Sequence, residues 1–348
     1  MKSSVQYSVI DAHSAGAPAR VVIGGVAPVP GARISEKRAY LMEHHDAIRK
    51  LLMYEPRGSS EMCGSILMQP CDPRADIGIV FIETGGWPLM CGAGTIGAAT
   101  VMVENGYVEV TEPLSRISFD TPAGLVTAEV EVANGVVKGV TIQNVASYMV
   151  APDQVVDLPA RGPVTLDIVF GGNYYALVAA SSLGLAVQPA YAEQLVSAGR
   201  AIRDSVNRDL HIIDPATGKA CHVPMVIFTE EQNSAGSYRN LVFFGEAGVD
   251  RSPGGTGTSA RMAQRFYRRQ QGLGDRFRHE SIIGSVFEGT FEETTKLTPH
   301  VEAIIPKIRG RAHIIAQSTF LLDPEDPFAE GFGVGYGSDA LPPANRTA

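Results

Sequence analysis

A short motif occurs twice in this chain, and one residue differs between the copies in a way that matters for chemistry. The first copy reads Cys91-Gly92-Ala93-Gly94-Thr95 and the second reads Gly254-Gly255-Thr256-Gly257-Thr258. Each copy leads into a segment with helical periodicity. A cysteine thiolate is a base, whereas glycine has no side chain. The pair predicts two similar ligand-binding loops, of which only the first carries a reactive thiol.

The residue types in these loops indicate a carboxylate ligand. Glycines allow the backbone to approach a ligand closely, and the first N–H groups of a helix have no intrahelical acceptor. Anions bind at such positions, and a cysteine placed there has its thiolate stabilised. The alternative for Cys91 is a buried, unreactive thiol. A phosphate-binding P-loop requires a lysine that neither copy has.

An acidic residue precedes the second copy, in the run Asp250-Arg251-Ser252-Pro253. Its carboxylate is suited to receive a substrate ammonium or ring N–H group, and its structural alternatives are a helix cap or an ion pair with Arg251. A carboxylate for the amine, amide groups for the carboxylate and a thiolate for the α-proton together describe an amino-acid site. This chemistry requires no pyridoxal phosphate, and we predict no cofactor.

The composition restricts the class of protein. The chain has 348 residues, 45% hydrophobic and 19% charged, which is typical of a globular protein with one large or two medium domains. A net charge of −8 argues against a nucleic-acid partner. The four cysteines lack zinc-binding spacing, so no metal is expected. No apolar run reaches the roughly 18 residues of a membrane span, and residues 1–7 lack the apolar core of a secretory signal. We therefore expect a cytoplasmic protein without a membrane partner.

The elements that position the loops follow an α+β pattern. Short β-branched runs bounded by Gly, Pro, Asn or Asp predict strands, and apolar periodicity predicts a few longer helices. The expected helices cover residues 36–53, 94–104, 190–210 and 257–271. The expected strands cover residues 21–23, 77–82, 125–132, 137–145, 163–170, 175–180, 224–229, 241–244, 281–291 and 312–315.

The spacing of these features indicates an internal duplication. The two glycine-rich loops lie about 160 residues apart, and so do two similar turns that enter apolar strands, at residues 15–22 and 171–178. We predict two similar domains. Residues 1–155 with 318–348 form the first, which carries Cys91, and residues 156–317 form the second, which carries Gly254.

Five motifs spread along the chain carry a family resemblance. Residues 11–22 resemble D-x-H-S/T-x-G-E-P-x-R-V-V, residues 55–58 match E-P-R-G, residues 90–97 resemble M-C-G-H-G-T-I-G, residues 171–173 match G-G-N, and residues 250–258 resemble D-R-S-P-C-G-T-G-T. The sequence is similar, nearly end to end, to the proline racemase superfamily. That superfamily includes hydroxyproline 2-epimerases and trans-3-hydroxy-L-proline dehydratases.

The resemblance implies a fold and a set of site residues. Two diaminopimelate-epimerase-like domains are expected, each a β-sheet wrapped around a central helix, with the substrate cleft between them. It also implies cofactor-independent chemistry on proline or hydroxyproline and a homodimer. Carried over by position, Cys91 accepts the α-proton and Asp250 meets the ring nitrogen. The substrate carboxylate is expected at the amides of Gly92, Ala93, Gly255 and Thr256.

Several positions depart from the racemase and epimerase pattern. Gly254 replaces the second cysteine, Ala93 replaces a histidine, Ala17 replaces a glutamate, and Ser59 follows E-P-R-G where epimerases often have histidine. A two-base racemase needs a proton-transferring group on each face of the α-carbon, and glycine offers none. A dehydratase needs only one base, and the family's dehydratases commonly carry threonine or another non-cysteine residue at the second position. Gly254 is consistent with that class but is not its usual residue. Residues 321–328 also resemble the longer family members, among which dehydratases are frequent.

The sequence thus leaves three hypotheses. The leading one is a trans-3-hydroxy-L-proline dehydratase, in which Cys91 removes the α-proton and loss of water gives a pyrroline-2-carboxylate. The second is a hydroxyproline 2-epimerase or proline racemase in which water replaces the second thiol at Gly254. The third is a binding protein for a proline derivative that keeps the amide groups but has little turnover.

Overall fold

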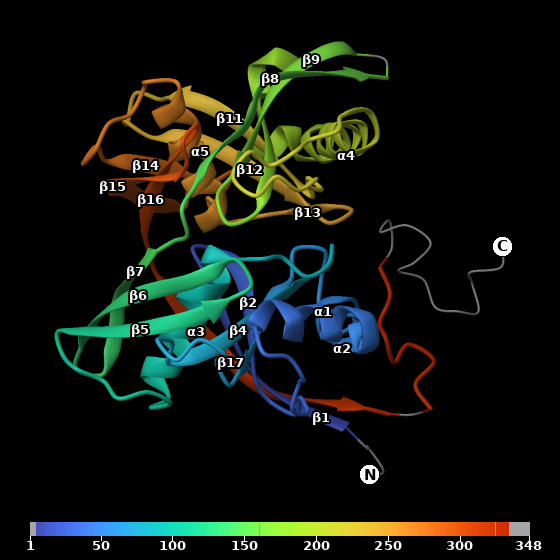
Figure 1. Cartoon of the computed structure of the whole chain (residues 1–348). Helices are drawn as coiled ribbons and strands as arrows, with labels where there is room; N and C mark the ends of the chain where they lie inside the picture. The colour runs from blue at the N-terminus through green and yellow to red at the C-terminus, as the bar shows by residue number, and fades with distance from the viewer. Residues whose placement is uncertain (1–4, 160, 324, 334–348) are drawn as a thin grey trace. The chain divides into compact units, whose positions relative to one another are not determined.

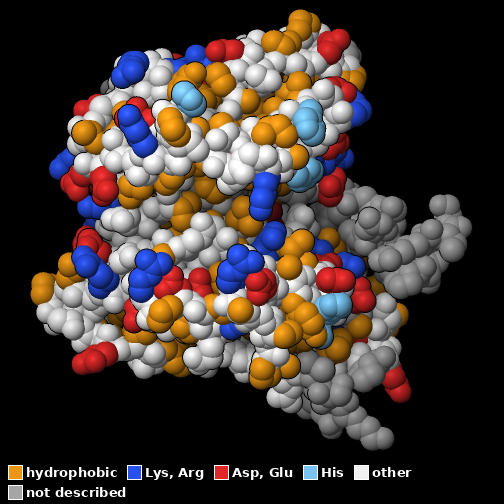
Figure 2. Space-filling model, viewed as in Figure 1, with side chains coloured by type: hydrophobic (Ala, Val, Ile, Leu, Met, Phe, Trp, Pro, Cys, Tyr) orange, Lys and Arg blue, Asp and Glu red, His pale blue; other side chains and the backbone are white. Residues whose placement is uncertain are grey.

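The computed structural model describes residues 5–159, 161–323 and 325–333. These residues form two compact units. The first comprises residues up to Thr141, Gly245–Gly248 and the segment from Arg311 onward, and the second comprises Ile142–Phe244 and Val249–Gly310. Within the described part of the chain, no helix has both the length and the apolar character of a membrane span. On the face shown in Figure 2, Lys and Arg side chains are interspersed with Asp and Glu.

The first unit is a sheet whose strands pair in a continuous order, β17–β1–β2–β3–β4–β5–β6 (Figure 1). The β2–β3 and β4–β5 pairs are parallel and the other pairs are antiparallel. The strands are β1 (Val5–Ser14), β2 (Ala17–Gly24), β3 (Cys63–Met68), β4 (Ile77–Glu83), β5 (Leu114–Thr121), β6 (Gly124–Ala133), β7 (Val136–Gln143) and β17 (Ala312–Leu322). The helices are α1 (Ile34–His44), α2 (Asp46–Met53) and α3 (Gly92–Glu104).

Helix α3 forms the centre of this unit. It packs against β1, β2, β3, β6 and β17, and its residues from Gly92 to Val103 are all buried. The helix is rich in small residues, and a β-carbon on Gly97 would lie 3.0 Å from that of Ala19 on β2. Small side chains therefore let the strands close around the helix.

The second unit repeats this plan. Its strands pair in the order β8–β9–β10–β11–β12–β14–β15–β16, with β10–β11 and β12–β14 parallel and the others antiparallel. The strands are β8 (Tyr148–Leu158), β9 (Gly162–Phe170), β10 (Tyr174–Ala179), β11 (Met225–Gln232), β12 (Tyr238–Phe244), β13 (Gly248–Val249), β14 (Phe277–Glu280), β15 (Val286–Thr298) and β16 (Val301–Gly310). The helices are η1 (Ala180–Leu183), η2 (Pro189–Tyr191), α4 (Ala192–Asp209) and α5 (Gly255–Tyr267).

The duplication predicted from the spacing of motifs is confirmed by the strand order. Both units begin with two antiparallel pairs and continue with a parallel, an antiparallel and a second parallel pair. The turn between β1 and β2 corresponds to the turn between β9 and β10, where the two similar sequence segments lie. Helix α5, like α3, has 13 residues, and it is buried from Gly255 to Arg265 against β8, β9, β10, β15 and β16.

The element boundaries differ from the predictions in several places. The helix expected over residues 36–53 is two helices, because His45 leaves the helical conformation at φ −138° and ψ 27°. Within the strand expected over residues 281–291, residues 282–284 form a turn and the strand begins at Val286. Strands β1, β3, β5, β8, β13, β14 and β16 were not predicted. Residues 142–155 pack in the second unit rather than the first, because β8 pairs with β9. Residues 334–348 of the predicted first domain lie outside the described residues.

The G-G-N motif has a packing explanation in this fold. Gly171 begins the β9–β10 turn and lies directly against the first turns of α5. A β-carbon there would lie 2.3 Å from the Thr256 carbonyl oxygen and 2.6 Å from the Ala260 nitrogen. The Asn144 side-chain amide donates to the Gly171 carbonyl (2.8 Å) and to the Ser259 hydroxyl (2.9 Å). Glycine at 171 is therefore what lets the turn support the start of α5.

Gly171→Ala is expected to lower the free energy of unfolding by about 3 kcal/mol, because the added methyl collides with backbone atoms that cannot rotate away. Denaturant unfolding followed by circular dichroism measures this. Gly272→Ala is the control, since its β-carbon would lie 3.6 Å from the Asp275 side chain, and a change within about 0.5 kcal/mol is expected. Equal losses in the two variants would contradict the packing argument.

Candidate active site

The loop that carries Cys91 connects β4 to α3. After β4, Glu83 and Gly86 exchange backbone hydrogen bonds of 2.9 and 3.2 Å and reverse the chain. Cys91 is the N-cap of α3, with an extended backbone at φ −135° and ψ 111°. Its carbonyl accepts hydrogen bonds from the N–H (2.9 Å) and the hydroxyl (2.8 Å) of Thr95. The thiol is thus placed at the helix start, as the sequence predicted.

The Cys91 sulfur contacts the start of helix α3. Gly94 N–H donates to Sγ at 3.3 Å, and the sulfur lies at the positive end of the α3 dipole. Among the described residues, no acceptor is recorded for the N–H groups of Gly92 and Ala93. The side chain is only partly buried. The loop therefore combines an accessible thiol with two amide groups that are able to bind an anion.

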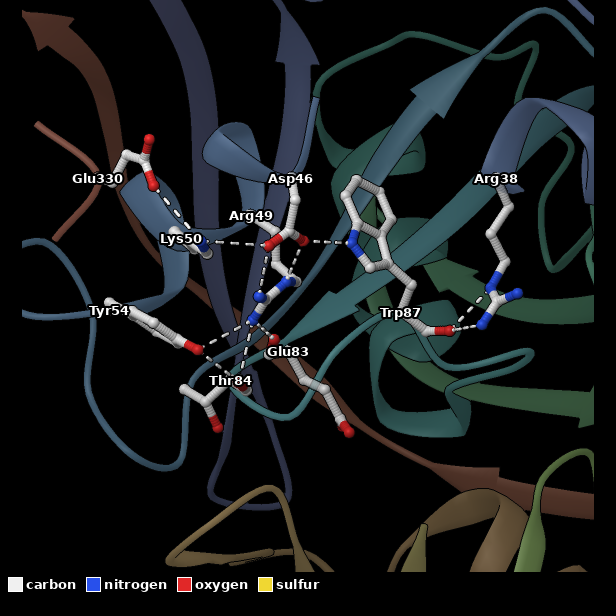
Figure 3. A network of polar contacts seen from close by, with 9 residues as sticks. All are labelled: Arg38, Asp46, Arg49, Lys50, Tyr54, Glu83, Thr84, Trp87 and Glu330. Atoms are coloured by element: carbon white, nitrogen blue, oxygen red, sulfur yellow. Dashed lines mark hydrogen bonds and ion pairs between the residues drawn. The ribbon is translucent and has the colours of Figure 1, made fainter. Parts of the chain in front are cut away.

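A network of polar side chains holds the segment before Cys91 (Figure 3). The guanidinium of Arg49 on α2 donates to the carbonyls of Glu83 (3.0 Å) and Thr84 (2.9 Å) at the end of β4. It also forms a two-pronged ion pair with Asp46 at 2.7 and 2.8 Å. The same carboxylate accepts the indole N–H of Trp87 at 2.7 Å, and Arg38 donates to the Trp87 carbonyl. Helices α1 and α2 thereby fix residues 83–87.

The second loop is built on the same plan but begins with a different backbone. Gly254 is the N-cap of α5 and has φ 75° and ψ 112°, a combination that residues with a side chain rarely adopt. A β-carbon at this position would lie 3.1 Å from Cγ2 of Val242 and 3.5 Å from Oδ2 of Asp250. Replacement of the second cysteine is thus accompanied by a backbone that favours glycine.

Hydrogen bonds between side chains stabilise the beginning of α5. The Thr258 hydroxyl donates to the Gly254 carbonyl at 2.7 Å and lies 2.9 Å from Nδ1 of His279. Burial, followed by the charge of Arg261, lowers the pKa of His279 to about 3. The imidazole is therefore neutral. Because the Thr258 hydroxyl gives its proton to the hydrogen bond with the Gly254 carbonyl, Nδ1–H of His279 is the donor to that hydroxyl. The Thr256 hydroxyl meets the Tyr175 hydroxyl at 2.6 Å. Among the described residues, no acceptor is recorded for the N–H groups of Gly255 and Thr256.

Asp250 lies beside this loop. Its N–H donates to the Val242 carbonyl on β12 (2.9 Å), and its Oδ1 accepts the N–H (2.7 Å) and the hydroxyl (2.8 Å) of Ser252. Burial raises the pKa of Asp250 to about 6, although the hydrogen bonds from Ser252 and the charge of Arg251 act in the opposite direction. In the second unit the structure therefore brings together Asp250, Gly254, Gly255 and Thr256, and in the first unit Cys91, Gly92 and Ala93.

Two of the family motifs prove to be structural. Arg20, from the N-terminal motif, pairs with Asp11 of the same motif at 2.9 and 3.0 Å. It also donates to the carbonyls of Leu52 (2.6 Å) and of Arg57 in E-P-R-G (2.7 Å). A β-carbon on Gly58 would lie 2.1 Å from the Met53 carbonyl oxygen. Sequence reasoning missed this connection between the motifs, because its partners are carbonyl groups far away in the chain.

The Arg49 network was also missed, although the i,i+3 spacing of Asp46 and Arg49 in a predicted helix was an available signal.

Arg49→Met is expected to lower the free energy of unfolding by about 3 kcal/mol, because Asp46 and two buried carbonyls lose their donor. Arg33→Met is the matched control, since Arg33 pairs with Glu36 at the surface and little change is expected. Denaturant unfolding of both variants measures the difference, and similar losses would contradict the role of Arg49.

The environments of two cysteines predict a difference in reactivity. Burial, followed by the charge of Asp214, raises the pKa of Cys221 to about 11, so that on the order of one Cys221 thiol in 10³ is ionised at pH 7.5. Cys91, at a helix N-terminus, is expected to react with iodoacetamide at least about 100-fold faster. Peptide mass spectrometry over time measures both rates, with the partly buried Cys71 as reference. Equal labelling of Cys91 and Cys221 would refute the assignment of Cys91 as the activated thiol.

Comparisons with known proteins bear on the family and the fold. Residues 9–333 match the family model described as proline racemase. A 4-hydroxyproline 2-epimerase from Streptosporangium roseum is 44% identical over 334 residues, covering 95% of this chain and 99% of that protein. A proline racemase from Clostridioides difficile is 40% identical over 333 residues, with coverage of 95% and 99%.

A solved structure confirms the predicted fold class. The hydroxyproline epimerase from Agrobacterium vitis, with bound trans-4-hydroxy-L-proline, superimposes with a TM-score of 0.91 at 30% identity, covering 98% of this chain and 99% of that one. The resemblance read from the motifs is therefore correct: this chain belongs to the proline racemase family of enzymes.

Proposed function

We propose that this protein inverts the configuration at the α-carbon of proline or 4-hydroxyproline, with the Cys91 thiolate as the base that removes the α-proton. The observation that carries the proposal is the position of Cys91 as the N-cap of the buried helix α3, where Gly94 N–H donates to its sulfur. The names of the relatives, 4-hydroxyproline 2-epimerase and proline racemase, support the substrate class and the reaction. The ligand in the Agrobacterium vitis structure supports it as well.

The remaining predicted site residues have roles that their environments support. The N–H groups of Gly92 and Ala93, and of Gly255 and Thr256, are proposed to bind the substrate carboxylate, because each pair lies in the first turn of a buried helix. Asp250 is proposed to receive the ring nitrogen. Gly254 has no group that transfers a proton, so the second proton has to come from another donor, such as water.

Dehydration of trans-3-hydroxy-L-proline is the second candidate. Gly254 specifically favours it, since elimination of water needs no second thiol. The sequence alone ranked this reaction first. We now rank it second, because the similar proteins carry the names of isomerases.

A panel of proline, 4-hydroxyproline and 3-hydroxyproline isomers in deuterium oxide, followed by proton NMR, separates the two reactions. The expected result is loss of the α-proton signal together with formation of the α-epimer of proline or 4-hydroxyproline. Formation of a cyclic imine from trans-3-hydroxy-L-proline, trapped with borohydride, in the absence of epimerisation would favour the dehydratase. A panel in which no compound reacts would refute the proposed function.

Cys91→Ser is expected to slow epimerisation by about 10²–10⁴-fold in both directions, because a hydroxyl is a much poorer base than a thiolate. Chiral chromatography of the products measures the rate. Cys71→Ser is the control, since that thiol makes only a weak contact, 3.9 Å from the Gly31 carbonyl, and unchanged turnover is expected. Full activity in the Cys91 variant would show that another group is the base.

A further inference from the structure

The last described residues of the chain, 325–333, follow β17 and lie against the E-P-R-G motif at residues 55–58 of the first unit. They overlap the sequence motif at residues 321–328, which has no part in the chemistry proposed above. We propose that residues 325–333, the C-terminal strap, position the loop that carries Cys91 and are needed for turnover. This inference rests on the proposed function and adds to it a segment that contributes no reacting group.

The strap binds the E-P-R-G motif at two points. The Arg57 guanidinium forms an ion pair with Asp326 at 2.6 Å and donates to the Phe328 carbonyl at 3.1 Å. The exposed fractions of the two charged side chains are 12% and 26%, so solvent screens this pair less than a fully exposed one. Near the other end of the strap, Phe332 N–H donates to the Glu55 carbonyl at 2.8 Å. An ion pair and two hydrogen bonds to carbonyls therefore hold the strap on the motif.

Gly331 allows the strap to lie directly on the end of α2. Its φ is 74°, a conformation that disfavours residues with a β-carbon. A β-carbon there would lie 2.8 Å from the Glu55 carbonyl oxygen and 2.8 Å from Cβ of Tyr54. Gly135 has nearly the same φ, 72°, but a β-carbon there would meet nothing within 4 Å among the described residues. The strap is thus closely packed against Tyr54, the residue that leads from α2 into the motif.

Tyr54 connects the strap to the segment before Cys91. Its hydroxyl donates to the Thr84 carbonyl at 3.1 Å, and the Thr84 hydroxyl donates to the Ser60 carbonyl at 3.1 Å. Thr84 lies in the turn at residues 83–86 that follows β4 and leads to Cys91. Residues on both sides of the E-P-R-G motif therefore bind this turn, so that holding the motif also holds the turn.

A second connection runs through charged side chains (Figure 3). Glu330 of the strap pairs with Lys50 at 3.3 Å, and the Lys50 ammonium lies 3.8 Å from the Asp46 carboxylate. Asp46 also binds Arg49, which donates to the Thr84 carbonyl at 2.9 Å. Because the Lys50 and Glu330 side chains are 22% and 56% exposed, we expect this connection to be the weaker one. Both connections end at the same carbonyl group.

The position of the base determines the rate of proton transfer. A base has to lie within hydrogen-bonding distance of the proton that it removes, and a displacement of about 1 Å can lower turnover about 10²-fold. The Cys91 thiol stands at the end of the loop that begins with residues 83–86. A strap that fixes this turn therefore keeps the thiol where the reaction needs it.

Gly331→Ala is expected to displace the strap, because the added methyl collides with the residues that the strap covers. We expect hydrogen–deuterium exchange to become faster in residues 55–60 and 83–90, and kcat for epimerisation of 4-hydroxyproline or proline to fall by about 10²-fold. Peptide mass spectrometry measures the exchange, and chiral chromatography measures kcat. Gly135→Ala is the matched control, since it places the same methyl at nearly the same φ in open space, and wild-type exchange and wild-type kcat are expected.

The free energy of unfolding of each variant, from denaturant titration, separates positioning from stability. A Gly331→Ala protein that is folded at the assay temperature and has lost kcat supports the inference. A loss of stability with wild-type kcat would show that the strap only stabilises the unit, and unchanged exchange in residues 83–90 would show that it does not act on the turn. Either result overturns the inference. If the wild-type protein turns over none of these substrates, the proposed function fails, and the exchange of residues 83–90 still decides whether the strap holds the turn.

Arg57 provides a second test that leaves the glycine in place. Arg57→Met removes the ion pair with Asp326 and the hydrogen bond to the Phe328 carbonyl, so the same faster exchange and loss of kcat are expected. Arg57→Lys keeps a charge opposite Asp326 and is expected to recover part of kcat. Arg116→Met is the control, since the pair of Arg116 with Glu129 has the same length, 2.6 Å, and lies at the surface of the same unit. Wild-type kcat in Arg57→Met would contradict the role of the strap.

Discussion

The structure depends on the first N–H groups of two buried helices, for which the described part of the chain provides no acceptor. The first amides of a helix have no acceptor within it, and burying α3 and α5 leaves those of Gly92, Ala93, Gly255 and Thr256 able to bind an anion. Each unit wraps its sheet around one such helix. The fold thus places a helix start that is able to bind an anion in each unit, beside Cys91 in the first and Asp250 in the second.

Much of the remaining structure keeps these helix starts in place. In the first unit, Arg49 and Asp46 fix the end of β4 and Trp87 ahead of Cys91. In the second unit, the lack of a side chain at Gly171 allows the β9–β10 turn to pack against α5. The Thr258 hydroxyl, itself hydrogen-bonded to His279, donates to the Gly254 carbonyl. The two supports use different chemistry, an ion-pair network in one unit and close backbone packing in the other. The duplicated fold therefore does not impose duplicated side chains.

The loss of symmetry between the loops has a structural counterpart. Cys91 caps α3 from an ordinary extended conformation, whereas Gly254 caps α5 from a conformation that favours glycine. The carboxyl group of Asp250 stands beside the position that a second thiol would use, and burial shifts its pKa toward neutrality.

The sequence by itself determined the duplication, the helix starts at Cys91 and Gly254, and the family, because these depend on local patterns such as glycine spacing and apolar periodicity. It predicted neither the strands β1 and β8 nor the break at His45. The tertiary structure alone decided what Arg20 and Arg49 bind, since their partners are backbone carbonyls distant in the chain. It also decided the state of Asp250, because burial and the distance to Gly254 arise only when β12 and the start of α5 are packed together.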